Sequence, residues 1–407
     1  MRLVAIVALV SATACSGDAA PVDTRVVHTD SMQVEIITHL GDGSLLPVDS
    51  LSDDPVLAIR SGAASDVIFH RLTDVTPLSN GTIAVAASGS RAIYLFDRRG
   101  SFKMSLGRDG DGPGEFRAIW GAVALQGDSL VVFDSRLGRL TIFSAAGQVA
   151  RTLDISRFLP PARGADVHPL DSGFALVGLA STGMHRSEGT YRDSAASYLL
   201  DVNGDSVGFY GEFPGSEVSY AERLFGSSPF GARLFSGVRD GRLIIGNSSE
   251  PELREYATTG RLVRVIRWPD HDRHVTESRA AEYIAYRVQS LAKNVRDQFG
   301  QDLGELPYSH TEPAYYDLVV SSGGMIWLGD YPGPEALLPE PAPKPRLWTL
   351  FGPDGVRLRL IYSPPGFALR AVQSGLAYGI QTDDLGVQSV VVYRVPECDS
   401  CKDLDGK

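Results

Sequence analysis

The sequence predicts an all-β fold, a six-bladed β-propeller with four-stranded antiparallel blades and one helical insertion. Three observations support this prediction: two β-strand signals alternate along the chain, one segment has helical periodicity, and a strand near the N-terminus is placed to complete the last unit. A four-stranded meander cannot bury both of its faces alone, so repeated meanders must pack face to face. Arranged around one axis they form a propeller, which we place in residues 55–396.

The first β-strand signal is a tight turn followed by an apolar run. Its six copies begin at Asn80, Gly127, Ser172, Asp240, Gly323 and Ser374. The second signal is a strand that ends in an apolar residue, followed by three turn residues and a glycine. It occurs at 96–100, 143–147, 200–204, 256–260 and 351–355. Glycine-containing pairs supply the positive φ that tight hairpins need, so each unit is expected to contain two hairpins.

The sixth unit lacks its outermost strand. Its third strand ends in the apolar residues 390–393, and Pro396 follows. Residues 56–62 precede the first unit much as residues 104–110 precede the second. We expect residues 56–60 to supply the missing strand from the opposite end of the chain, with residues 33–38 as the second choice. Such closure would remove an open sheet edge that favours aggregation.

The N-terminal residues have the features of an export signal. Arg2 precedes an apolar run at 3–10, which is too short to cross ~30 Å of hydrocarbon, a distance that needs about 20 residues. Residues 12–15, Ala-Thr-Ala-Cys, resemble the lipobox of bacterial lipoproteins. The resemblance implies a signal peptide at 1–14, an acylated Cys15, and a lipid anchor on the periplasmic or outer-membrane side of the bacterial cell envelope. The alternative is an ordinary secretory peptide with an unmodified Cys15.

Two polar segments flank the predicted propeller. Residues 15–54 are broken by Gly and Pro, and we expect them to form a tether to the membrane. Residues 397–407 form a short acidic tail that contains Cys398 and Cys401. These two cysteines have redox spacing, but their acidic neighbours would raise the thiol pKa. In an oxidising compartment a disulfide between them is the expected state.

Residues 107–116, Gly-Arg-Asp-Gly-Asp-Gly-Pro-Gly-Glu-Phe, carry a more specific resemblance. They are similar to the Gly-Pro-Gly-Glu-Phe loop between blades of bacterial six-bladed β-propeller lipoproteins, relatives of the NHL-repeat proteins. Residues 306–327 also resemble the start of a late blade in that group, and the repeat phase agrees over most of 55–396. The resemblance implies a fold and an exported location. It carries over no catalytic residue.

One segment, the insertion at 269–313, breaks the β rhythm. From 277 to 299 the apolar residues fall three or four apart, which is typical of an amphipathic helix. Thr276 is placed to cap its start, and Gly300 follows its end. We expect this helix to lie on one face of the disc. It would serve as a lid over the channel, as a docking element or only as packing against a blade.

Six polar or aromatic residues near the predicted innermost strands are candidates for lining the central channel. They are His70, Trp120, His168, Arg233, Asp317 and Arg370. The alternative is that such side chains only bind buried water around the axis. Their location follows from the repeat and not from a catalytic motif.

No catalytic, metal or cofactor motif is assigned. Residues 204–208 match the hydrolase pattern Gly-x-Ser-x-Gly, but they fall in a predicted hairpin and lack the strand-to-helix turn that this chemistry needs. Two acidic runs, 109–115 and 201–205, lack the Gly and Glu spacing of a calcium loop. The histidines at 271 and 274 would need a short helix and a third ligand to hold a metal.

The charge balance excludes one class of partner. The chain has 407 residues, 43% of them apolar, and a net charge of −11, which would repel a phosphate backbone. We therefore expect no nucleic-acid partner, and a monomer on the membrane. The first functional hypothesis is a binding or scaffolding module for a protein, peptide or glycan. The alternative, by analogy of fold, is a propeller enzyme, a metal-dependent lactonase or hydrolase or a lyase, with its site at the central channel.

Overall fold

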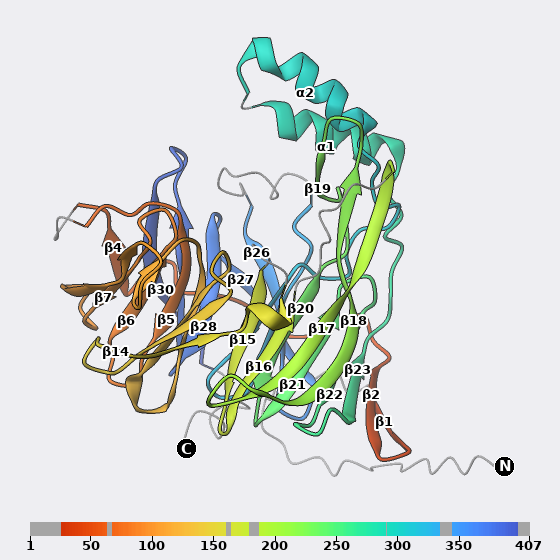
Figure 1. Cartoon of the computed structure of the whole chain (residues 1–407). Coiled ribbons are helices and arrows are strands. Elements are labelled where there is room, and N and C mark those ends of the chain that lie inside the picture. The colour runs from red at the N-terminus through yellow and green to blue at the C-terminus, as the bar shows by residue number, and fades with distance from the viewer. Residues whose placement is uncertain are drawn as a thin grey trace.

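Six antiparallel sheets stand around a common axis in the computed structural model (Figure 1). The structure describes residues 26–62, 67–159, 164–178, 187–289, 291–333 and 344–397. The innermost strands contact one another in a closed ring, in the order β5, β11, β15, β20, β24, β28 and back to β5. The predicted six-bladed β-propeller is therefore confirmed.

Each blade runs from an inner to an outer strand. Blade 1 contains β5 (Leu72–Pro77), β6 (Ile83–Ala87), β7 (Ala92–Phe96) and β8 (Phe102–Leu106). Blade 2 contains β11 (Ile119–Ala124), β12 (Leu130–Asp134), β13 (Arg139–Phe143) and β14 (Val149–Asp154). Blade 3 contains β15 (Ala165–Leu170), β16 (Gly173–Gly178), β17 (Gly189–Asp201) and β18 (Ser206–Tyr220), with β19 (Phe225–Ser227) at its edge.

The remaining blades follow the same order. Blade 4 contains β20 (Leu234–Arg239), β21 (Arg242–Asn247), β22 (Glu252–Tyr256) and β23 (Leu262–Arg267). Blade 5 contains β24 (Asp317–Val320), β25 (Ile326–Gly329), β26 (Arg346–Phe351) and β27 (Arg357–Ser363). Blade 6 contains β28 (Phe367–Gln373), β29 (Leu376–Thr382), β30 (Gln388–Arg394) and β4 (Leu57–Arg60). Two short strands, β9 (Arg108–Asp109) and β10 (Glu115–Phe116), pair in the loop between blades 1 and 2.

The second strand of a blade explains the apolar runs of the repeat. All residues of β6, β12, β16 and β25 are buried, because neighbouring blades cover both faces of each sheet. The turns that precede the second strands are tight. Before β21 and β29, at Asp240-Gly241 and Ser374-Gly375, both residues have positive φ, as a two-residue type I′ hairpin requires.

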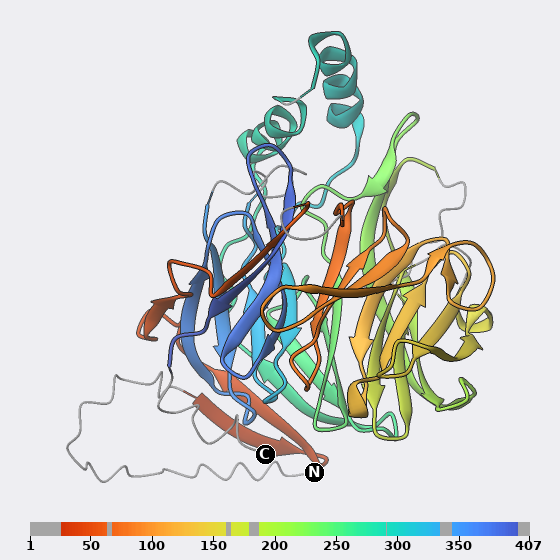
Figure 2. The same cartoon turned by 90° about the vertical axis from the view of Figure 1, so that its left-hand side faces the viewer.

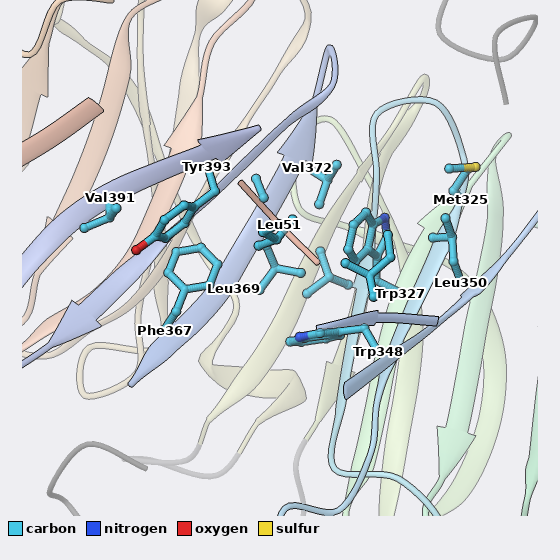
Figure 3. Close-up of a cluster of buried hydrophobic side chains, with 13 residues drawn as sticks. Leu51, Met325, Trp327, Trp348, Leu350, Phe367, Leu369, Val372, Val391 and Tyr393 are labelled. Atoms are coloured by element: carbon cyan, nitrogen blue, oxygen red, sulfur yellow. The ribbon is translucent and has the colours of Figure 1, made fainter. Parts of the chain in front are cut away.

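Buried apolar clusters fill the six spaces between adjacent blades. The cluster between blades 5 and 6 is built around Trp327 and Trp348, both fully buried, with Phe367 and Tyr393 from the neighbouring blade (Figure 3). Leu51, from the segment before blade 1, also packs into it. Stability therefore depends on contacts between blades more than on any single sheet.

A strand from the N-terminal side closes the ring, as the sequence predicted. Strand β4 pairs antiparallel with β30, and Ile59 lies opposite Val390. Both side chains join the core between blades 6 and 1. The strand chosen first, residues 56–60, is confirmed over Leu57–Arg60.

The segment that precedes β4 differs from the predicted tether. Within 15–54, residues 26–50 contain β1 (Val26–Ser31), β2 (Val34–His39) and β3 (Val48–Ser50). Strand β2 pairs parallel with the outer strand of blade 4, and β3 pairs parallel with that of blade 5. The second-choice closing strand, 33–38, thus extends blade 4. The assignment of 26–50 to a tether was wrong because these short strands are stabilised by the blades that receive them, which local polarity does not reveal.

The insertion forms two helices instead of the single predicted helix. Helix α1 (Glu277–Gln289) and helix α2 (Lys293–Glu305) pack together on one face of the disc, which we name the helix face (Figures 1 and 2). Thr276 accepts the backbone N–H of Arg279 at 3.2 Å, so the predicted cap is confirmed. Gly300 lies inside α2, because the chain breaks the helix earlier, at the extended residue Ala292. Neither helix is long and apolar enough to cross a membrane, and the described residues contain no other helix that is.

Candidate functional site

A cavity of about 300 Å³ opens where the inner strands begin, on the helix face. We name it the channel mouth. Every blade contributes a side chain to its wall. These are Asp74 from blade 1, Trp120 from blade 2, Asp166 and His168 from blade 3, Ser236 from blade 4, Asp317 from blade 5 and Arg370 from blade 6.

β-bulges place several of these side chains. The register shifts in the first half of three inner strands, between residues 72 and 74, 119 and 121, and 369 and 371. The three extra residues are Thr73, Trp120 and Arg370, and all three line the cavity. Bulges redirect side chains and are frequent at functional sites. The ring of Trp120 is 45% exposed, so it offers an aromatic surface to a ligand.

A hydrogen-bonded network joins blades 3 and 4 at the cavity wall. The Ser236 hydroxyl donates to Asp166 Oδ2 at 2.8 Å, and His168 Nε2 lies 2.8 Å from the same Ser236 oxygen. Because a serine has one proton, its donation to Asp166 leaves His168 Nε2–H as the donor in the second bond. The arrangement is a relay from His168 through Ser236 to the carboxylate.

Burial shifts the pKa values of the two titratable groups, Asp166 and His168, in opposite directions. It raises the pKa of Asp166 to about 6, and the carboxylates of Asp74 and Asp317 add to the increase. It lowers the pKa of His168 to about 4. At neutral pH Asp166 is therefore mostly charged and His168 is neutral.

The other two carboxylates of the channel mouth have cationic neighbours. Asp317 pairs with Arg346 at 2.8 Å. Asp74 accepts the N–H groups of Val75 and Ala122, and the charge of Arg370 partly offsets the burial that raises its pKa. Asp166 differs from both, because no cation among the described residues shifts its pKa.

Asp74 and Arg370 line the channel mouth and also a cavity beyond it. Both line a second cavity of about 400 Å³ on the opposite side of the disc. Arg370 Nε donates to the Thr73 carbonyl at 3.1 Å, which ties the guanidinium to the adjacent inner strand of blade 1. A ligand at the channel mouth would meet this pair at its inner end.

The structure separates the six candidate channel residues. Trp120, His168, Asp317 and Arg370 line the channel mouth. His70 is exposed before β5, where its carbonyl accepts the N–H of Gly89 at 3.0 Å. Arg233 lines a different cavity, beneath the helices, and its guanidinium carbon lies 4.2 Å from the centre of the Tyr316 ring. The prediction that His70 and Arg233 line the channel does not hold for the channel mouth.

Sequence reasoning missed Asp166, Ser236 and Asp74. Asp166 lies two residues before His168 on β15, and alternate residues of a strand share a face. That spacing would have identified it. Ser236 and Asp74 gave no comparable signal, because a bulge shifts the alternation on β5 and a serine in a strand is common.

The other motifs have structural roles. In the Gly-Pro-Gly-Glu-Phe loop, Glu115 accepts the Gly112 N–H at 2.8 Å and pairs with Arg108, while Phe116 is buried between blades 1 and 2. Asp109 and Asp111 pair with Arg117. This acidic run is therefore neutralised by arginines.

Residues 201–208 form the outer hairpin of blade 3. Asp201 accepts the N–H groups of Asn203 and Asp205, as a turn residue does. Ser206 begins β18, so it has no strand-to-helix turn.

The metal and cysteine candidates have separate outcomes. In the histidine segment, Asp270 pairs with Arg273, and the backbone of His274 bridges to Thr311. Within the described ranges no three His, Cys, Asp or Glu side chains gather as a metal site would require. Cys15, Cys398 and Cys401 lie outside the described residues, so their predicted acylation and disulfide stay predictions.

Comparison with known proteins supports the fold. No protein-family model and no curated protein matches the chain. A member of the DUF4221 family from Bacteroides vulgatus has a TM-score of 0.50 at 12% identity, covering 86% of this chain and 99% of that one. A Bacteroides fragilis protein named as exported has a TM-score of 0.49 at 11% identity, covering 89% and 100%. Virginiamycin B lyase from Staphylococcus aureus has a TM-score of 0.39 at 8% identity, covering 83% and 98%. At 12% identity the likeness to the DUF4221 protein concerns the fold alone.

Proposed function

We propose that this chain is an exported, lipid-anchored binding module whose ligand, a peptide or protein segment, inserts a cationic group into the channel mouth. The observation that carries the proposal is the carboxylate of Asp166. It is held in a cavity by Ser236, and no cation among the described residues offsets its burial. A half-buried carboxylate without a counterion is unfavourable, and a lysine or arginine side chain of a ligand would supply one.

The rest of the channel mouth suits the same ligand. Trp120 offers the ring type that attracts cations most strongly. Asp74 and Asp317 add negative potential, although each has its own arginine partner. Arg370 at the inner end would repel the cation from the axis and so limit its depth.

Binding of short peptides tests this proposal. The probes are acetyl-Gly-Lys-Gly-amide, acetyl-Gly-Arg-Gly-amide and the neutral acetyl-Gly-Gln-Gly-amide, titrated calorimetrically into the mature protein. The two basic peptides should bind with 1:1 stoichiometry, and Asp166→Asn should weaken them by roughly tenfold or more. Asp205→Asn is the control, because Asp205 is an exposed carboxylate remote from the channel mouth. The proposal would be rejected if all three peptides bound with equal affinity. It would also be rejected if the basic peptides bound Asp166→Asn as tightly as they bind Asp205→Asn.

Tryptophan fluorescence gives a second readout of where the ligand binds. Of the four tryptophans, Trp327 and Trp348 are fully buried and Trp268 packs against the core between blades 4 and 5, whereas Trp120 is exposed at the cavity. Binding at the channel mouth should therefore change the emission of Trp120, and Trp120→Phe should remove that change. An emission change that persists in Trp120→Phe would locate the ligand elsewhere.

Anchoring of the chain in the cell envelope is part of the same proposal. It is supported by the apolar run at 3–10 and the lipobox-like residues 12–15, together with the loop at 107–116 that resembles bacterial propeller lipoproteins of the NHL-related group. Mass spectrometry of the membrane-extracted protein should detect an acylated Cys15 as the first residue. An unmodified Cys15 in a soluble periplasmic chain would leave export intact and remove the anchor. A monomer without nucleic acid is the expected form.

An enzyme is the second candidate, and one observation favours it. The carboxyl of Asp166 has a pKa of about 6, in the range of a general base, and it contacts a hydroxyl in a cavity. These residues fit acid–base chemistry better than the metal-dependent reaction considered from the fold. Hydrolysis or elimination of a small ester or lactone that Asp166→Asn abolishes would support this alternative.

A further inference from the structure

A third cavity, of about 390 Å³, lies between the helices, residues 224–233 that connect blades 3 and 4, and the nearby end of blade 5. We name it the helix cavity. Its apolar wall comes from the buried cluster that attaches the insertion, including Phe230, Tyr283, Leu303 and Leu306. A concave apolar wall with a few polar groups is typical of a small-molecule site.

The helix cavity carries positive charge without a compensating carboxylate. Arg233 and Arg287 line it, and no Asp or Glu is among its described lining residues. Arg287 Nε is buried with no hydrogen-bond partner in the described part of the chain. Neither arginine has an ion pair within that part, although other arginines of the insertion do: Arg279 pairs with Glu312 and Arg273 with Asp270.

The two guanidinium groups line the same cavity and lie near the same tyrosine. Both act on the hydroxyl of Tyr283, where they oppose the increase in pKa that burial causes. Two like charges near one point are unfavourable, and more so in a cavity than in water. In a chain with 49 acidic residues against 38 basic ones, two unpaired cations in one cavity need an explanation. An anionic ligand would provide it.

Tyrosine hydroxyls add further donors. Tyr283, Tyr316 and Tyr331 line the helix cavity, and burial raises the pKa of each, so all three stay protonated. The hydroxyl of Tyr331 is buried and has no partner among the described residues. The cavity thus has donors that lack acceptors, which is the complement of a carboxylate or phosphate.

We propose that the helix cavity binds a small organic anion, a carboxylate or phosphate group attached to an apolar body, between Arg233, Arg287 and the three tyrosines. The anionic group would accept from the guanidinium groups and hydroxyls, and the apolar body would pack on Phe230 and Leu306. Because the helix cavity shares no lining residue with the channel mouth, it does not depend on the function proposed there.

Calorimetric titration of the mature protein tests this inference. The probes are 3-phenylpropionate, phenyl phosphate and the uncharged 3-phenylpropanamide. At least one anion should bind saturably with 1:1 stoichiometry, while the amide should bind at least tenfold more weakly. The stronger anion identifies the group that the site prefers. Absence of binding by both anions at millimolar concentration would overturn the proposal, and so would equal binding of the amide.

Two variants locate the bound anion. Arg287→Gln should weaken the preferred anion by roughly tenfold, because it removes one charge and a fork of donors. Arg223→Gln is the matched control, since Arg223 is an exposed arginine near Asp302 that does not line the cavity. Arg287→Lys keeps the charge and should restore part of the affinity. If Arg287→Gln folds normally and binds the anion as the native chain does, the assignment of the site is wrong.

Discussion

The channel mouth and the helix cavity open on the same face of the disc but differ in the sign of their charge. The channel mouth is lined by Asp74, Asp166 and Asp317 against one arginine, whereas the helix cavity has two arginines and no carboxylate among its described lining residues. The first is built by inner strands of all six blades, and the second by the insertion together with residues 224–233 that connect blades 3 and 4. Repetition and insertion therefore produce two different recognition surfaces on one scaffold.

The boundary between the two cavities is narrow. Arg233 and Tyr316 line the helix cavity, while Ser236 and Asp317, only one to three residues further along the chain, line the channel mouth. The guanidinium of Arg233 stacks on Tyr316 at 4.2 Å. Blades 4 and 5 thus contribute residues to both cavities. Variants can therefore change the blade that both cavities share, or one cavity alone.

The largest effect is expected from blade 4, which both cavities share. Glu255 accepts from Arg239, and both side chains are almost fully buried in blade 4. Glu255→Gln would leave the Arg239 charge uncompensated and should lower the free energy of unfolding by about 3–5 kcal/mol. The exposed Asp205, which pairs with Arg157 at 2.7 Å, is the control, and Asp205→Asn should cost about 0–1 kcal/mol. Denaturant unfolding measures both, and equal costs would show that the buried pair does not support blade 4.

At the channel mouth we expect a smaller change in the free energy of unfolding, and an increase instead of a decrease. In the folded chain the pKa of Asp166 is about 6, compared with an ordinary value of 3.8. The folded state therefore binds the proton more tightly than the unfolded state, and the free energy of unfolding falls as pH rises between these two values. Above pH 6 the charged carboxylate costs up to about 3 kcal/mol. Asp166→Asn should therefore stabilise the protein at pH 7 while it weakens the basic peptides. A variant that is less stable than the native chain at pH 7 would contradict this account.

The pH dependence of the same variant gives an internal check. The pKa of His168 is lowered to about 4 from 6.5, so its contribution to stability is present above pH 6.5 and is lost as pH falls toward 4. In the native chain the opposite trend of Asp166 offsets part of that loss. Asp166→Asn should show a steeper loss between pH 6.5 and 4 in unfolding experiments. Asp330, whose pKa burial raises to about 6, contributes equally to both chains and cancels in the difference.

The smallest effect is expected at the boundary. Tyr316→Leu removes the ring under Arg233 and should lower the free energy of unfolding by about 0.5–1 kcal/mol. It also frees the guanidinium to move, so the affinity for the organic anion should change while that for the basic peptides stays within twofold. A larger change for the peptides would mean that the two cavities act as one site.

The sequence predicted the repeat better than it predicted the sites. Turn glycines and buried second strands recur locally, so the six blades and the closing strand at Leu57–Arg60 could be found from the pattern. A strand at 33–38 was also a candidate, but its pairing with blade 4 and the pairing of β3 with blade 5 could not be predicted. Both depend on blades about 230 to 310 residues away, as the pairing of Glu35 with Arg264 and of Asp49 with Ile361 shows. The break between the two helices depends on Ala292, which has no helix-breaking side chain.

The candidate site shows the same limit. Trp120 and Arg370 were predicted from their positions at the start of inner strands, and β-bulges then turn them into the cavity. The bulges themselves have no sequence signature here. Ser236 becomes important only because blade 3 places Asp166 and His168 within 2.8 Å of its hydroxyl, and that proximity depends on how two sheets pack.

The most direct test is one competition titration with both kinds of ligand. A basic tripeptide is titrated into the native protein and into Asp166→Asn, each in the absence and presence of saturating 3-phenylpropionate or phenyl phosphate. We expect the peptide to bind the native chain equally well with and without the anion, and to bind Asp166→Asn at least tenfold more weakly in both conditions. Displacement of the peptide by the anion, or unchanged peptide affinity in Asp166→Asn, would contradict the assignment of two cavities with opposite charge preference.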